Sequence, residues 1–236
     1  MTLTATIADV SARFPDFRAA LVVADGLVLG TERPAALDAL IAEREEACRS
    51  RWAGAELSEI PGIAAWRTAY KGFGIKKTSY RSSVERLVKR VKAGERLPAV
   101  NGLVDIYNAV SLTHVFCCGA DDLDQVAPPL AFRFARPGDT FVDMGAEPGE
   151  SANDPPKEGE VVYADERHVL CRRWNWRQDA RTGITPATRR AVITIQANGP
   201  GDLDAAVADL TERVAHYVGA TCRAGVADAN RPILIL

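Results

Sequence analysis

The segment 172–178 carries the densest group of side chains that could bind a ligand. It reads Arg-Arg-Trp-Asn-Trp-Arg-Gln and holds two of the four tryptophans in the chain. If this segment forms a strand, both indole rings project from the same face. Indole and guanidinium groups stack on bases or aromatic rings, and guanidinium and amide groups hold phosphate or carboxylate. In the alternative interpretation, both indoles cover the core and the arginines are solvated. The pattern favours a ligand site formed by Arg173, Trp174, Asn175, Trp176 and Arg177.

A second group of polar side chains lies inside the mostly apolar segment 100–112. A buried carboxylate or carboxamide must find a hydrogen-bonding partner. Asp105 and Asn108 therefore either tie neighbouring loops together or face a pocket, and capping a loop is the favoured role for Asp105. The apolar residues of this segment recur at helical spacing, which predicts a largely buried helix: Leu103, Ile106, Tyr107 and Val110.

The cysteines and histidines match no catalytic or metal-binding pattern. The chain has five cysteines and three histidines without CxxC, HxxH or HExxH spacing, so a histidine-rich metal site is not expected. Cys117 and Cys118, with His114 or His168 as a base, follow no pattern of a catalytic thiol. The sequence also lacks a phosphate-binding glycine loop and a GxSxG motif. We expect no metal ion, no cofactor, and reduced thiols typical of the cytoplasm.

The composition is that of an ordinary globular protein, but the charges are segregated. The 236 residues are 47% hydrophobic with a net charge of −2, and no apolar run reaches the roughly 20 residues of a membrane span. Residues 67–96 hold ten Lys or Arg, residues 166–190 hold seven arginines, and residues 143–165 hold seven carboxylates. This segregation favours an anionic ligand, although solvated helix faces balanced by acidic neighbours fit equally well. We expect a cytoplasmic protein with neither a membrane nor DNA as partner.

Hydrophobic patterning predicts the elements that position these groups. Helices are predicted at 34–52, 63–70, 82–91, 100–112 and 202–220. Ser82 and Glu85 have the spacing of a capping box at the start of one of them. Because no long linker divides the chain, we expect one α+β domain over residues 1–236, with a β-sandwich-like core flanked by helices. Short apolar runs predict strands at 17–29, 130–134, 140–144, 160–164, 168–172 and 191–195.

The stretch 97–108 resembles the signature of a known domain. Its sequence, Leu-Pro-Ala-Val-Asn-Gly-Leu-Val-Asp-Ile-Tyr-Asn, fits the pattern P-x-x-N-x-x-V-D-x-x-N of the B3/B4 domain in the bacterial phenylalanine–tRNA ligase beta subunit. The stretch 165–196 resembles the second half of that domain. The likeness covers residues 60–200, with the N-terminal strand and helix and the C-terminal helix packed onto this core. The chain therefore resembles free-standing B3/4-domain proteins, which implies an α+β fold.

The resemblance also implies an editing pocket, because these synthetase domains hydrolyse mischarged tyrosyl-tRNA. Counting along the motif without gaps places Tyr107 at the family's threonine and Asn108 at its asparagine. Gly119 falls where the family has a pocket histidine, and Thr194 falls near its glutamate, so neither of those two family residues is matched. The positions that do match the family are Asn108, Asp122 and Thr188.

Two functions are compatible with these observations. The first is a trans-acting aminoacyl-tRNA deacylase of altered specificity, in which Asn108, Asn175 and Arg173 donate hydrogen bonds to the reacting ester. The second is a non-catalytic module that binds an amino acid, a small metabolite or an RNA end in the same pocket. Its partner is accordingly tRNA, aminoacyl-tRNA or a small amino-acid-like ligand. The residues expected to bind the substrate are Tyr107, Gly119, Trp174, Trp176, Arg177, Thr188 and Thr194.

Overall fold

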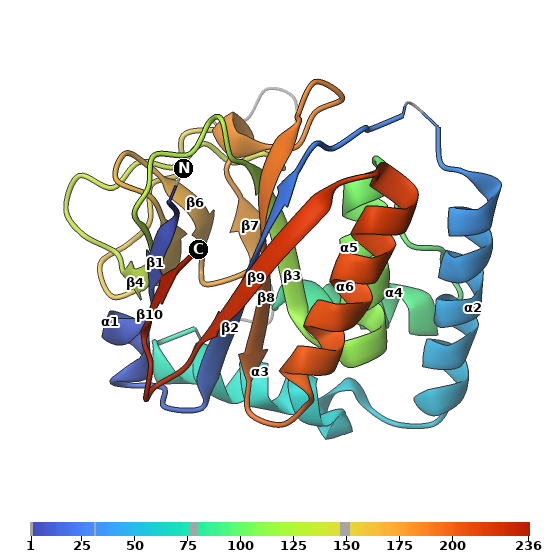
Figure 1. The fold of residues 1–236 in the computed structure, drawn as a ribbon. Coiled ribbons are helices and arrows are strands. Elements are labelled where there is room, and N and C mark those ends of the chain that lie inside the picture. The colour runs from blue at the N-terminus through green and yellow to red at the C-terminus, as the bar shows by residue number, and fades with distance from the viewer. Residues whose placement is uncertain (1, 31, 76–79, 147–151) are drawn as a thin grey trace.

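The two longest strands, β2 (Phe17–Asp25) and β8 (Arg190–Asn198), pair antiparallel at the centre of a four-stranded sheet. The computed structural model describes residues 2–30, 32–75, 80–146 and 152–236. Most side chains on both faces of β2 and β8 are buried, because helices cover one face of the sheet and a second sheet lies against the other (Figure 1). Strands covered on both faces read as continuous apolar runs, as β2 does over residues 19–24, whereas β8 includes the polar residues Thr194 and Gln196.

The four-stranded sheet is antiparallel throughout and has the order β3-β8-β2-β9. Its edge strands are β3 (Cys117–Asp122) and β9 (Thr221–Ala227). The free edge of β3 is the part of this sheet that reaches the candidate site described below.

The second sheet has six strands in the order β10-β1-β4-β5-β6-β7. Only the β1–β4 pair is parallel, and β6 and β7 lie at the end of the sheet that faces β3. Figure 1 shows both chain ends at this sheet, beside β1 and β10. The bounds are β1 (Thr4–Thr6), β4 (Leu130–Phe134), β5 (Val161–Ala164), β6 (Val169–Arg172), β7 (Arg177–Gln178) and β10 (Ile233–Ile235).

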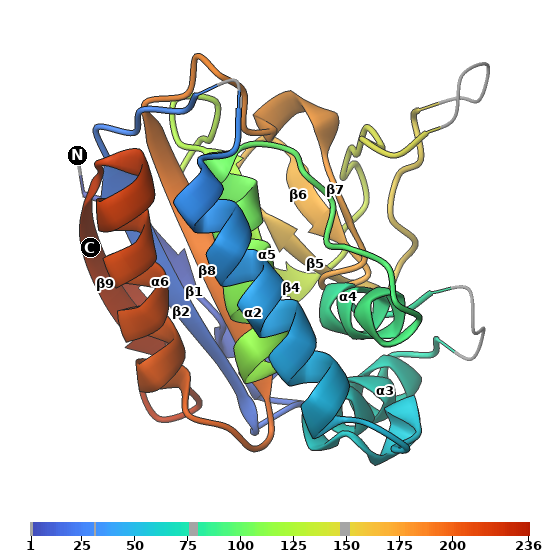
Figure 2. The same cartoon turned by 90° about the vertical axis from the view of Figure 1, so that its right-hand side faces the viewer.

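The helices form the third layer. α5 (Gly102–His114) and α6 (Leu203–Val218) pack on the four-stranded sheet, and α2 (Ala35–Arg51) packs over α5 (Figure 2). The remaining described helices are α1 (Ala8–Ser11), α3 (Pro61–Gly72), α4 (Ser83–Lys92) and the 3-10 helices η1 (Leu57–Glu59) and η2 (Ala180–Thr182). None of the helices in the described ranges combines the length and apolarity needed to cross a membrane.

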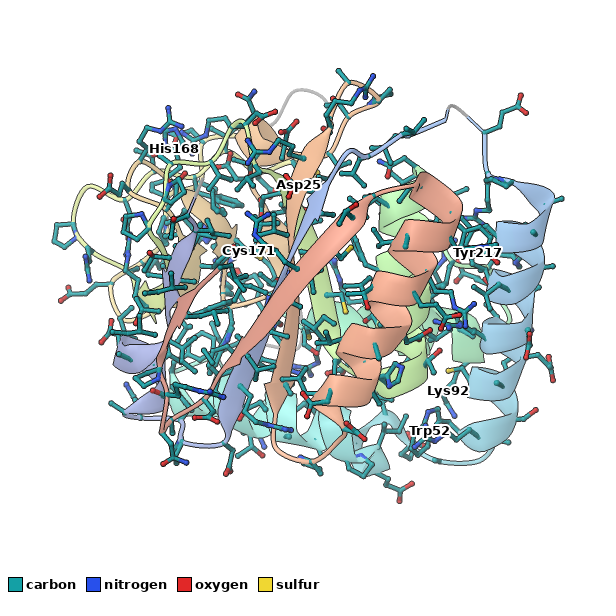
Figure 3. The ribbon with its side chains drawn as sticks, in the orientation of Figure 1. Asp25, Trp52, Lys92, His168, Cys171 and Tyr217 are labelled. Atoms are coloured by element: carbon teal, nitrogen blue, oxygen red, sulfur yellow. The ribbon has the colours of Figure 1, made fainter. Side chains whose placement is uncertain are left out.

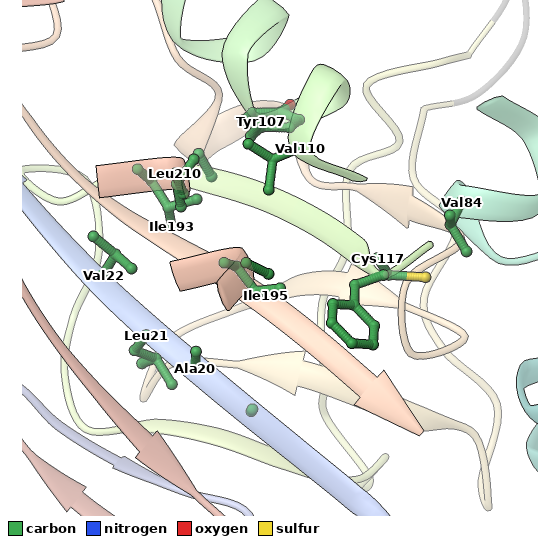
Figure 4. Packing of buried hydrophobic residues seen from close by; sticks show 14 of the residues in the cluster. Ala20, Leu21, Val22, Val84, Tyr107, Val110, Cys117, Ile193, Ile195 and Leu210 are labelled. Carbon is green, nitrogen blue, oxygen red and sulfur yellow. The ribbon is translucent and has the colours of Figure 1, made fainter. Parts of the chain in front are cut away.

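The main core covers both faces of the four-stranded sheet and includes the layer between that sheet and the helices. Figure 4 shows Ile193 and Ile195 of β8 packed among Val110 of α5 and Leu210 of α6, and all four side chains are fully buried. At the far end of the helical layer, the Lys92 ammonium donates a hydrogen bond to the Trp52 carbonyl, as Figure 3 shows, and so links the ends of α4 and α2. The site is thus built on a rigid, packed support.

The helices that lead to the site begin at capping residues. Ser82 Oγ accepts a hydrogen bond from the Glu85 amide at 3.4 Å, and Asn101 Oδ1 accepts one from the Val104 amide at 3.0 Å. Both side chains satisfy amides that have no partner inside the helix. The predicted capping box is only half formed, because the Glu85 carboxylate pairs with Arg67 instead of returning to Ser82.

The predicted α+β class is confirmed, with differences in detail. Each predicted helix is present within a few residues of its expected bounds. The predicted strand 17–29 ends at Asp25, since Gly26 turns the chain with a φ of 83°. The predicted strand 140–144 is wrong, because only isolated bridges at Val142 and Asp143 occur there. Strands β1, β3, β9 and β10 were not predicted at all.

Candidate ligand-binding site

A cavity of about 560 Å³ lies where the edge of the four-stranded sheet meets the end of the six-stranded sheet. Residues 118–121 of β3 form one wall, and α4 and α5 stand beside it. The opposite wall consists of β5, β6, β7 and the turn that joins β6 to β7. This volume suits a small ligand such as a nucleoside or an amino acid.

Seven of the ten predicted site residues line this cavity. They come from segments far apart in the sequence: α5, β3, the β6–β7 hairpin and β8. These seven are Tyr107, Asn108, Gly119, Asn175, Trp176, Arg177 and Thr194.

Gly119 and Thr194 face each other across the β3–β8 pair. A Cβ atom added at Gly119 would meet nothing nearer than the Thr194 hydroxyl oxygen, 4.0 Å away. The absence of a side chain at this position therefore leaves open space beside a hydroxyl group. A ligand can occupy the room that a larger residue would fill.

A directed series of hydrogen bonds fixes the hydroxyl of Thr194. The Tyr70 hydroxyl donates to Asn175 Oδ1 at 3.0 Å, Asn175 Nδ2 donates to Gln196 Oε1 at 3.2 Å, and Gln196 Nε2 donates to Thr194 Oγ1 at 3.1 Å. All four side chains are buried. Because Thr194 Oγ1 accepts from Gln196, its own proton is available to donate to a ligand. Asn175 therefore positions Thr194, since its carboxamide is already committed to Tyr70 and Gln196.

Asn108 presents a free carboxamide to the cavity. It is half-buried on α5, and its side chain makes no hydrogen bond within the described part of the chain. An amide of this kind offers two donors and one acceptor. Asn108 and Thr194 thus provide two donors for an oxygen atom bound in the cavity.

Asp121 is the single carboxylate among the described lining residues. Its Oδ1 accepts hydrogen bonds from Thr182 Oγ1 at 2.6 Å and from Gln178 Nε2 at 3.0 Å. Burial raises the pKa of Asp121 to about 7 in spite of these bonds, and the charges of Asp179 and Asp165 act in the same direction as burial. At neutral pH this carboxyl group is poised to gain or lose a proton.

Basic and aromatic side chains surround the cavity. Arg86 and Arg90 of α4 are exposed at its edge, and Arg86 has no ion pair within the described ranges. The Arg177 guanidinium binds Asp143 Oδ2 at 2.5 Å and lies 4.7 Å from the centroid of the Trp176 ring. A half-buried indole bordered by guanidinium groups is suited to stack on a base.

The thiols that line the cavity are not activated. Cys118 and Cys171 both lie in its wall, and burial raises the pKa of each thiol well above its ordinary value. Nucleophilic cysteines instead have a lowered pKa. These cysteines therefore act as ordinary packing residues.

The two tryptophans do not project from one face of a strand. Residues 173–176 form a turn in which Arg173 and Trp174 have φ angles of 46° and 68°. Trp174 is 0% exposed and packs against Trp66, with ring centroids 5.2 Å apart, and against Phe17 at 4.9 Å. Trp174 is therefore a core residue, which corrects its predicted role in substrate binding.

Arg173 and Thr188 also lie outside the cavity wall as far as the structure describes it. The Arg173 guanidinium stacks 3.9 Å from the ring centroid of Tyr80 and 4.4 Å from that of Trp176. Thr188 Oγ1 donates to Asp122 Oδ2 at 2.6 Å, and both residues are buried. Arg173 supports Trp176, whereas Thr188 and Asp122 hold the fold together, which corrects the predicted contacts with substrate.

Asp105 ties loops together, as predicted. Its carboxylate accepts from Arg33 Nε at 2.8 Å and from the Val100 amide at 3.0 Å. The signature stretch thus contains three residues that line the cavity, Pro98, Tyr107 and Asn108, among residues that shape the helix and its approach.

Most arginines of the predicted basic runs are paired with carboxylates. Examples are the pairs Arg172–Glu160, at 2.8 Å, and Arg181–Asp179, at 2.6 Å. The interpretation of charge balanced by acidic neighbours therefore holds for most of these residues, although Arg172 is buried rather than solvated. Of the described arginines that line the cavity, Arg90 and Arg177 are also paired with carboxylates, whereas Arg86 is not. In the described ranges, no group of three His, Cys, Asp or Glu side chains is placed to hold a metal ion. Lys76, Lys77, Glu147 and Glu150 of the predicted charge runs lie outside the described residues.

The sequence profile of the B3/4 domain matches residues 65–208, more than half of the chain. The chain belongs to the B3/4 domain family. This confirms the family that the motif at 97–108 indicated. No curated protein matches the chain. Among solved structures, an N-terminal fragment of the phenylalanyl-tRNA synthetase beta subunit from Pyrococcus horikoshii is similar, with a TM-score of 0.48 and 13% identity over 94% of this chain. The match covers 50% of that fragment, so this chain spans about half its length.

Proposed function

We propose that this B3/4-domain protein binds the aminoacylated 3′ end of a tRNA in its cavity and hydrolyses the ester bond. The observation that supports this most is the convergence of two free donors, on Asn108 and Thr194, in a cavity bordered by arginines. A neutral donor pair inside suits an ester carbonyl, and cationic groups at the edge suit the phosphates of an RNA end.

The reaction requires little from the protein beyond orientation. Water attacks the ester carbonyl, the new C–O bond forms, and the bond to the ribose oxygen breaks. The Thr194 hydroxyl and the Asn108 amide donate hydrogen bonds to the carbonyl oxygen as it gains negative charge. The neighbouring ribose hydroxyl relays a proton from the water to the departing ribose oxygen. The protein favours this relay by holding the ribose in place.

Trp176 and the arginines provide the contacts for the nucleotide. The half-buried indole offers a surface on which the terminal adenine stacks. Arg86, which has no ion pair in the described part of the chain, is available for a backbone phosphate. Contacts of this type bind phosphates regardless of base sequence.

A non-catalytic binding role is the second candidate, and one observation favours it. None of the described lining residues is a histidine. Gly119 occupies the position at which the family has its pocket histidine. Binding without turnover would use the same cavity and the same donors.

The test is hydrolysis of a panel of mischarged tRNAs by the purified protein. We expect at least one aminoacyl-tRNA to be hydrolysed faster than in buffer, and Asn108→Ala to lower that rate about a hundredfold to a thousandfold, as for loss of one oxyanion donor. Asn230→Ala, an exposed asparagine in the turn before β10, is the matched control. If every mischarged tRNA survives the wild-type protein, the hydrolytic function is wrong, and saturable binding would then support the second candidate.

A further inference from the structure

Two buried polar side chains in the cavity are not used by the proposed hydrolysis. Asp121 is 4% exposed and Tyr163 is 2% exposed, and both line the cavity. The hydroxyl of Tyr163 has no hydrogen-bonding partner among the described residues. Asp121 uses Oδ1 for Thr182 and Gln178, and its Oδ2 has no hydrogen bond in the described ranges. Buried polar atoms without partners are uncommon and indicate a missing ligand or water.

The strand pairing brings these two residues to one region of the cavity. Tyr163 of β5 is paired with Cys171 of β6, which is paired with Gln178 of β7. Residues paired across neighbouring strands project from the same face of the sheet. Gln178 then donates directly to Asp121 on β3. The Tyr163 ring is held by stacking on Phe132, with centroids 4.6 Å apart.

The electrostatic field in this region favours a cation. Asp121 lies close enough to Asp179 and Asp165 for their charges to raise its pKa, and the charge of Asp121 likewise raises the pKa of Tyr163. Positive side chains, Arg86 and Arg177 among them, also line the cavity. A ligand with a cationic group at one end and an anionic group at the other complements this distribution.

We propose that Asp121 and Tyr163 form a subsite for a primary ammonium group. Asp121 Oδ2 accepts a charge-assisted hydrogen bond from the ammonium group, and the Tyr163 oxygen accepts a second. This inference rests on the proposed function and specifies its substrate class: esters of amino acids with a free amine, as distinct from N-acylated esters. The ammonium group belongs either to the α-carbon or to the end of a side chain.

The subsite also gives a physical reason for a carboxylate at this buried position. A buried carboxylate without a cation is destabilised by the loss of water. A bound ammonium group offsets that loss, and it lowers the pKa of Asp121 again by stabilising the ionised form.

The test is calorimetric binding of four non-hydrolysable amides of 3′-amino-3′-deoxyadenosine. The acyl groups are L-leucyl, 4-methylpentanoyl, which lacks the amine, N-acetyl-L-leucyl, and 6-aminohexanoyl, which carries the amine at its end. We expect one of the two amine-bearing amides to bind at least about tenfold more tightly than the two amides without a free amine, as for a hydrogen bond to a charged group. Tight binding of the leucyl amide assigns the α-ammonium, and tight binding of the 6-aminohexanoyl amide assigns a side-chain ammonium.

Two variants attribute the preference to these residues. Asp121→Asn keeps an acceptor for Thr182 and Gln178 and is expected to abolish the preference for the amine. Tyr163→Phe removes a hydroxyl that has no hydrogen-bonding partner in the described part of the chain. We expect it to fold normally and to reduce the preference severalfold. Asp124→Asn, on the surface just after β3, is the control that retains it. Equal binding of all four amides by the wild type overturns the ammonium subsite alone, whereas binding of none of them contradicts the proposed function as well.

Discussion

Asp121 makes both ligand binding and folding stability depend on pH. Burial raises its pKa from the ordinary value of 3.8 to about 7. Between these two values, the folded protein retains a proton that the unfolded chain releases. The contribution of this residue to stability is therefore fully present below about pH 4 and is lost as the pH rises to about 7.

Asp121→Asn should remove this loss of folding stability at rising pH. Relative to wild type, the variant is expected to gain about 1–3 kcal/mol in free energy of unfolding between pH 5 and pH 8, since each pKa unit corresponds to about 1.4 kcal/mol. Urea unfolding at the two pH values measures the difference. Asp124→Asn, at a half-exposed carboxylate, is the control and should show no such gain. A constant difference between Asp121→Asn and wild type at all pH values would contradict the raised pKa.

Individual site residues were predictable where a motif specified them. The stretch 97–108 favoured the loop-capping role of Asp105, because a buried carboxylate needs hydrogen-bonding partners, and it left Asn108 either tied to a loop or facing a pocket. Asp121 was not predicted as a cavity residue, since its importance depends on Gln178, Thr182 and Tyr163, which approach it only in three dimensions. The charged face of the helix at 82–91 did carry a signal for Arg86, but its position at the cavity depends on the packing of α4.

At the level of elements, the turn between β6 and β7 decides which indole reaches the ligand. Arg173 and Trp174 adopt left-handed φ angles, which strand periodicity cannot anticipate. The turn directs Trp174 into the core and leaves Trp176 at the cavity. The Asn175 carbonyl accepts a hydrogen bond from the Ser83 amide at 3.2 Å, so this turn is also fixed to the start of α4.

The two tryptophans therefore give opposite results when each is replaced by alanine. Trp174→Ala should destabilise the protein by about 3–5 kcal/mol, because it empties a fully buried aromatic site. Trp176→Ala should lower the free energy of unfolding by about 1 kcal/mol or less. It should weaken binding of the adenosine amides by about 1–3 kcal/mol, because a stacking surface is lost. Chemical denaturation and calorimetry measure the two quantities. Similar stability losses in both variants would contradict the assignment of Trp174 to the core.

The elements that sequence patterning missed share a physical cause. Strand β3 reads Cys-Cys-Gly-Ala-Asp-Asp, which lacks the β-branched and aromatic residues that favour strands. It becomes a strand because β8 pairs with it along its whole length. Residues 140–144 show the reverse, since they have strand-like composition but find no neighbouring strand to pair with. Helices were predicted better because their periodicity is local, whereas strand pairing is set by the tertiary fold.

On the scale of the whole molecule, charge is arranged locally rather than in excess. The net charge is −2, and most described arginines are paired with carboxylates, Arg90 and Arg177 at the cavity included. We therefore expect affinity for RNA to come from a few basic side chains, Arg86 first among those at the cavity. Sequence counting registered the basic runs but not their pairing, which depends on contacts such as Arg67–Glu85, at 2.7 Å. The single-domain organisation and the cytoplasmic location stay predictions.

Binding of tRNA should accordingly weaken with salt, with a slope set by a small number of phosphates. Arg86→Ala is expected to weaken binding and to reduce the slope of log K against log salt by about 0.7–0.9, the contribution of one phosphate contact. Filter binding over a series of salt concentrations measures this. Arg213→Ala, on α6 and paired with Asp209, is the matched control. An unchanged slope for Arg86→Ala would contradict the placement of a phosphate at this arginine.

A crystal structure of the protein with the leucyl amide of 3′-amino-3′-deoxyadenosine examines the cavity itself. We expect the carbonyl oxygen of this ligand within hydrogen-bonding distance of Thr194 Oγ1 and Asn108 Nδ2, and its adenine on Trp176. A ligand bound elsewhere on the surface, with the cavity closed by side chains, would contradict the assignment of this cavity as the site for an aminoacylated RNA end.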